Sequence, residues 1–160
     1  MTRTNPNNAN PGLGFTLIEL IVVIFILSIA SALIIPSFMD AGEGSLKADA
    51  KRIGSALRYV NDEGVGKKKD YLFNINLDND SYGFTGQGES RSFRLKDEVY
   101  LKDILIPSLG ARLDGEVTVK FGPLGAEEPI ILHLAKGKDD YTVIFNNISG
   151  KAGIYEGYKL

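Results

Sequence analysis

One acidic residue stands inside a long apolar segment near the start of the chain. Glu19 ends the run Gly14-Phe15-Thr16-Leu17-Ile18-Glu19, and the block from Leu20 to Met39 that follows contains no charged residue. A helix that crosses a bilayer needs about 20 consecutive apolar residues, so this block has a membrane-spanning length. An ionised carboxylate in such a segment is unfavourable without a partner. We therefore expect Glu19 to have a partner or a functional role.

A second set of acidic residues has spacing that suits calcium. Asp78, Asp80, Gly83 and Glu89 match positions 1, 3, 6 and 12 of an EF-hand loop. Tyr82 stands where that loop needs an oxygen ligand, and the flanking residues alternate as in strands. The turn preference of Asp and Asn explains the same residues as a hairpin turn. No metal site is predicted, and Asp78, Asp80 and Glu89 are the residues a calcium ion would use if one bound.

The remaining composition argues against an enzyme. His133 is the single histidine and lies inside an apolar strand-like run, where a histidine is more often structural than catalytic. The chain has no cysteine, which excludes thiol catalysis and cysteine zinc sites. Its 18 Lys and Arg residues against 20 Asp and Glu residues do not favour nucleic-acid binding. Neither a catalytic site nor a cofactor is predicted.

The pattern of apolar residues predicts one long, interrupted helix followed by strands. Pro36 and the glycines within residues 40–45 weaken helix formation, so a flexible stretch is expected there. From Ser45, apolar residues spaced by three and four predict an amphipathic helix that ends near Gly64 or Gly66. The run Lys67-Lys68-Lys69 is interpreted as a solvated linker.

After Asp70 the period of the apolar residues changes to two, which is typical of half-buried strands. Strands are predicted at 71–77, 82–85, 92–95, 117–121, 130–134, 141–145 and 152–155, separated by turns rich in Gly, Asn and Asp. The predicted fold class is α+β, with a long N-terminal helix packed on a C-terminal antiparallel β domain.

The run from Gly14 to Glu19, followed by aliphatic residues, resembles the leader and first helix of type IV pilins and of the pilin-like subunits of type II secretion. The resemblance implies cleavage by prepilin peptidase between Gly14 and Phe15, followed by N-methylation of Phe15. Counted from Phe15, Glu19 and Pro36 then occupy positions that the resemblance associates with filament assembly. Cleavage would create a positive amine on Phe15, and a carboxylate four residues later can meet that amine or a neighbour's, which favours correct axial register more than raw stability.

The implied organisation has four parts. Residues 1–14 are a prepilin leader peptide, 15–39 a transmembrane and assembly helix, 40–64 a flexible stretch and amphipathic helix, and 65–160 an exported β-rich domain. The implied location is the bacterial inner membrane, with a cytoplasmic N-terminus, a single pass and a periplasmic domain. The implied partners are prepilin peptidase, an inner-membrane assembly platform, membrane lipid and other pilins or pseudopilins.

The C-terminal part is similar to one branch of this family. The run 117–125, the strand 130–134 and the run Ser149-Gly-Lys-Ala-Gly153 resemble H-type minor pseudopilins of type II secretion and FimT-type minor pilins. The calcium-binding loop typical of the major secretion pseudopilin is not found after Asp140, which favours a minor subunit. The expected role is a tip-proximal subunit of a periplasmic filament that promotes protein export. A minor type IV pilin involved in pilus initiation or DNA uptake is the alternative.

Three other interpretations compete with this one. Ala30-Ser31-Ala32 fits the cleavage site of an ordinary secretory signal, although the apolar block continues past it. The block could also be a plain anchor in which Glu19 is incidental. Finally, the β domain could be a membrane-tethered binding module that never polymerises. A methylated Phe15 would distinguish assembly from these alternatives.

Overall fold

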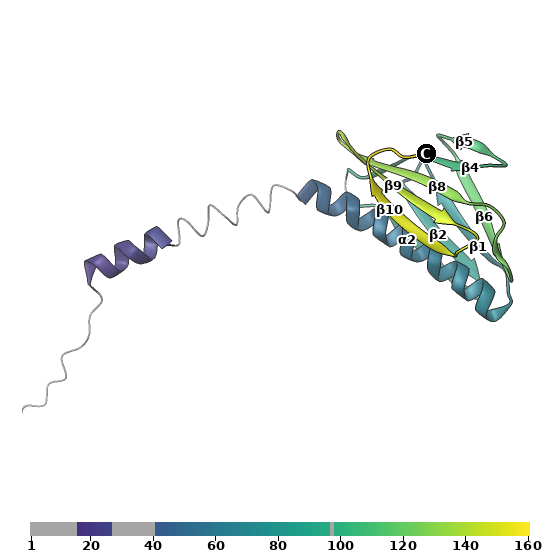
Figure 1. Cartoon of the computed structure of the whole chain (residues 1–160), viewed down its shortest axis with the longest axis horizontal. Helices are drawn as coiled ribbons and strands as arrows, with labels where there is room; N and C mark the ends of the chain where they lie inside the picture. The colour runs from purple at the N-terminus through teal and green to yellow at the C-terminus, as the bar shows by residue number, and fades with distance from the viewer. Residues whose placement is uncertain (1–15, 27–40, 97) are drawn as a thin grey trace, which may run out of the picture. The chain divides into compact units, whose positions relative to one another are not determined.

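The computed structural model describes residues 16–26, 41–96 and 98–160 (Figure 1). The chain divides into two compact units, Met1–Met39 and Asp40–Leu160. In the first unit, residues 17–26 are helical. Within the described ranges, no helix combines the length and the hydropathy required to span a bilayer. Gly14, Phe15 and Pro36 lie outside the described residues, as does most of the predicted leader and assembly helix.

The second unit begins with helix α2, Ala41–Lys67. The flexible stretch predicted at residues 40–45 is wrong for residues 41–45, which are helical. A glycine inside a helix costs only about 1 kcal/mol, and tertiary packing readily offsets that cost. The packing is close by, because Leu46, Asp49 and Ala50 are buried within the next turns.

Helix α2 is amphipathic as predicted, and its apolar stripe faces the strands. The stripe comprises Leu46, Ala50, Ile53, Leu57 and Val60, each at most 1% exposed. Its C-terminus is closed by a Schellman motif: Lys68 has a φ of 56°, and the Lys69 N–H donates to the Gly64 carbonyl at 3.2 Å. The three lysines interpreted as a linker therefore belong to the end of α2 and its cap.

In the described residues after α2, ten strands form two antiparallel sheets. The first sheet has the order β3-β2-β1-β6-β7, and the second has the order β10-β9-β8-β4-β5. Figure 1 shows α2 lying along the strands, and its contacts reach both sheets, chiefly β9 and β10. The strands are β1 Tyr71–Asn76, β2 Ser81–Gly86, β3 Glu89–Arg94, β4 Tyr100–Ile106, β5 Gly110–Arg112, β6 Glu116–Gly122, β7 Gly125–Ala126, β8 Ile130–Lys136, β9 Asp139–Asn146 and β10 Lys151–Glu156.

Aromatic residues join the two sheets in a single core. Phe121 of β6 contacts Phe145 of β9 with ring centroids 5.4 Å apart, and it also contacts Phe73 of β1 at 6.2 Å. All three side chains are fully buried. The predicted α+β architecture, with a helix packed on an antiparallel β domain, is confirmed.

Strands β4, β5 and β7 were not predicted, and β3 begins earlier than predicted. Strand β4 is hidden in the sequence because the pairing register shifts between Leu101 and Asp103 and breaks the period of two. Strands β5 and β7 have only three and two residues. Strand β3 begins at Glu89 rather than at Ser92. Its residues are exposed because β3 is the edge of its sheet, so its sequence carries little apolar signal.

Two turns that contain glycine pack against the Asn61 side chain of α2. The Asn61 side chain is buried, and a Cβ built on Gly125 or on Gly150 would lie 2.6 Å from its Oδ1 or Nδ2 atom, respectively. Both glycines have positive φ angles, 88° and 64°. These turns lie in the runs whose sequence resembles minor pseudopilins, and their glycines allow both loops to approach the helix closely.

Gly125→Ala is expected to destabilise the domain by about 2 kcal/mol, because the new methyl group adds a steric clash to an unfavourable backbone angle. Gly137→Ala is the matched control, since Gly137 has a φ of 61° and open space around its Cβ position. We expect the control to cost about 1 kcal/mol. Urea unfolding of the detergent-solubilised chain measures the free energy of unfolding of each variant. Equal losses in the two variants would show that the contact with Asn61 does not affect stability.

Candidate functional site

The N-terminal helical segment exposes apolar side chains on every side. From Leu17 to Ile26, the large apolar residues are 46–78% exposed. A helix that is apolar all round requires an apolar environment, which lipid or neighbouring helices can supply. This surface is the part of the described chain best suited to a membrane or to helix packing.

Glu19 and Thr16 form a reciprocal cap at the start of this segment. The Glu19 carboxylate accepts hydrogen bonds from the Thr16 backbone N–H at 2.9 Å and from the Thr16 hydroxyl at 3.0 Å. In return, the Glu19 N–H donates to the Thr16 hydroxyl at 3.3 Å. This is a capping box, in which the residue before the helix and its third residue satisfy each other's backbone donors.

The capping box adds a residue that the sequence interpretation did not assign. Thr16 was not singled out, although a threonine three residues before a glutamate at the start of an apolar run is the sequence signature of this cap. The cap directs the Glu19 carboxylate toward the N-terminal end of the helix, one residue from Phe15. The predicted pairing of Glu19 with the Phe15 amine lies outside the described residues.

The acidic residues considered for calcium do not come together. Asp78 accepts a hydrogen bond from Gly115 N–H at 3.0 Å, and Asp80 accepts one from Leu101 N–H at 2.8 Å. Glu89 begins β3 at the opposite end of the β2–β3 hairpin and pairs with Arg91 at 2.7 Å. In the described part of the chain, no three His, Asp or Glu side chains are grouped to hold a metal ion. The turn explanation accounts for Asp78 and Asp80.

His133 is fully buried and holds the C-terminal tail. Its Nδ1 atom lies 2.6 Å from Asp103 Oδ1, and its Nε2 atom lies 2.8 Å from the Lys159 carbonyl oxygen. Its ring stacks on Tyr158 with centroids 3.7 Å apart. Each ring nitrogen lies within hydrogen-bond distance of an oxygen atom, so the ring links β8 to Asp103 of β4 and to the tail. The protein surrounds the ring, and the ring has a structural role: it fixes the C-terminal tail to β8.

Thr142, the cross-strand neighbour of His133, also binds the C-terminal tail. The Thr142 hydroxyl donates to the Gly157 carbonyl at 2.7 Å and accepts from the Lys159 N–H at 3.0 Å. We refer to Asp103, His133, Thr142 and Tyr158 as the C-terminal clasp. The sequence showed only an isolated histidine, because its partners come from other strands and from the tail.

Comparison with known proteins gives two matches. Residues 13–35 match the prokaryotic N-terminal methylation motif. The structure is similar to that of the minor pseudopilin EpsH from the Type 2 secretion system of Vibrio cholerae, with a TM-score of 0.53 and 16% sequence identity over 70% of this chain and 97% of that one. The search among curated proteins gives no match.

The motif match covers the capping box and the apolar helix, and the structural match covers a length of chain far greater than the motif. At this level of identity, the likeness to EpsH shows the fold. The chain therefore joins a prokaryotic N-terminal methylation motif to a domain with the fold of a minor pseudopilin.

Proposed function

We propose that the protein is a minor, tip-proximal structural subunit of a type II secretion pseudopilus. The observation that carries the proposal is the combination of the methylation motif with a domain whose fold is that of a minor pseudopilin. In this role the chain has no catalytic step of its own. It is held in the inner membrane and then incorporated into a periplasmic filament that promotes protein export.

The proposed first step is cleavage between Gly14 and Phe15 by prepilin peptidase, followed by N-methylation of Phe15. Cleavage turns the Phe15 amide into a positively charged amine next to the capping box. Glu19 is already directed to this end of the helix by its hydrogen bonds to Thr16. A carboxylate and an amine in an apolar medium attract strongly, so the pair can set the axial register of adjacent helices.

The proposed second step is packing of the N-terminal helices inside the filament. The apolar side chains between Leu17 and Ile26, exposed in the single chain, would exchange lipid for neighbouring helices. The force for assembly is supplied by the inner-membrane platform. Pro36 is proposed to loosen the helix between its membrane and domain parts, because proline removes a helical hydrogen bond.

A minor type IV pilin is the second candidate, because the methylation motif by itself fits either kind of filament. Deleting the gene in the native host separates the two functions. Loss of exoprotein secretion with normal piliation and DNA uptake supports the secretion role. Normal secretion with loss of pili or of DNA uptake would overturn it in favour of the pilus role.

A further inference from the structure

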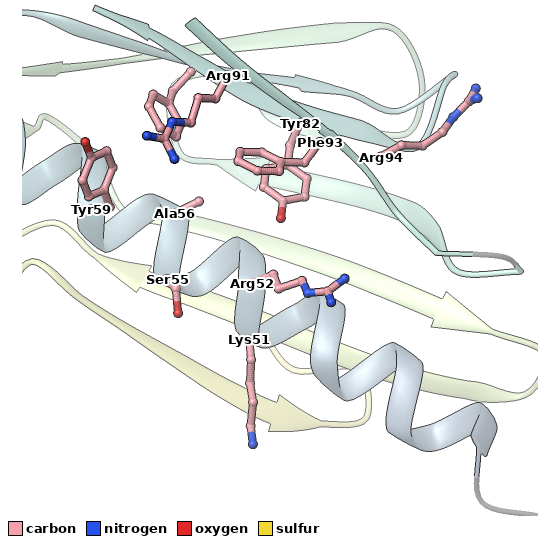
Figure 2. Close-up of a pocket in the computed structure, with 10 residues that line it drawn as sticks. Lys51, Arg52, Ser55, Ala56, Tyr59, Tyr82, Arg91, Phe93 and Arg94 are labelled. Carbon is pink, nitrogen blue, oxygen red and sulfur yellow. The ribbon is translucent and has the colours of Figure 1, made fainter. Parts of the chain in front are cut away.

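We draw no further inference here: the strongest candidate, the groove between α2 and the β2–β3 hairpin where the rings of Tyr59 and Phe93 are partly exposed (Figure 2), carries no proposal because nothing in the structure shows what covers it.

Discussion

Replacing Glu19 with glutamine is expected to lower incorporation of the subunit beside its neighbours on the order of tenfold or more, and as strongly as Glu19→Ala does. Glutamine can keep the capping box with Thr16, because its side chain still accepts the backbone hydrogen bond. It cannot keep the charge that the proposed amine of Phe15 requires. A positive group left without its partner in an apolar medium is strongly unfavourable. Membrane insertion should be unchanged in both variants.

Photocrosslinking from a benzophenone side chain placed at Val22 measures incorporation, since Val22 is exposed on the apolar helix. Thr16→Val is the matched control, because it removes the hydroxyl of the capping box but keeps the carboxylate. We expect this control to retain more crosslinking than Glu19→Gln. If Glu19→Gln crosslinks as well as the natural chain, the cap alone matters and the charge pairing is wrong.

Asp103→Asn is expected to destabilise the folded domain by about 1 to 3 kcal/mol, since it replaces the carboxyl group that is hydrogen-bonded to a buried ring with an amide and leaves a buried polar group unsatisfied. Asp103 is 4% exposed and His133 is fully buried, so water cannot replace the lost contact. The C-terminal tail should loosen with it, because the His133 ring also holds the Lys159 carbonyl. Thermal unfolding should shift down by roughly 10 °C.

Two further variants test whether the loss of stability comes from the C-terminal clasp or from an Asp→Asn change in general. Asp114→Asn makes the same change at an exposed position and should leave the unfolding temperature unaltered within error. The double variant Asp103→Leu with His133→Leu should lose less stability than Asp103→Asn, because it removes both partners of the buried hydrogen bond. An Asp103→Asn chain as stable as the natural one would show that the clasp does not hold the fold.

The sequence predicted the parts of the fold whose signal is local. The apolar stripe of α2 and the alternating residues of β1, β6 and β9 have the periods of a helix and of half-buried strands, and all are found. Strand β4 was missed because the register shift beside Asp103 disrupts that alternation. Gly42 and Gly44 favour a flexible stretch, but the burial of Leu46 and Ala50 keeps the helix formed.

The site residues divide in the same way. Glu19 was found because a charge inside an apolar block is visible in the sequence, while its partner Thr16 was overlooked. The spacing of Asp78, Asp80 and Glu89 suits calcium, but Glu89 lies at the end of the β2–β3 hairpin opposite to Asp78 and Asp80. The Asp103–His133 pair joins β4 to β8 and could not be found from spacing, because it depends on which strands become neighbours. The groove lined by Tyr59 of α2 and Phe93 of β3 could not be predicted from the sequence, because it forms only where α2 and the edge strand β3 come together.

The mature N-terminus tests the central claim most directly. Mass spectrometry of the protein purified from its native host should show a chain that begins at Phe15 and carries a methyl group on the Phe15 amine. Gly14→Val, in the same host, should leave the leader attached and serves as the unprocessed reference. A natural chain that keeps Met1 to Gly14, or one cut after Ala32, would contradict the proposed processing and with it the pairing of Glu19 with a new amine.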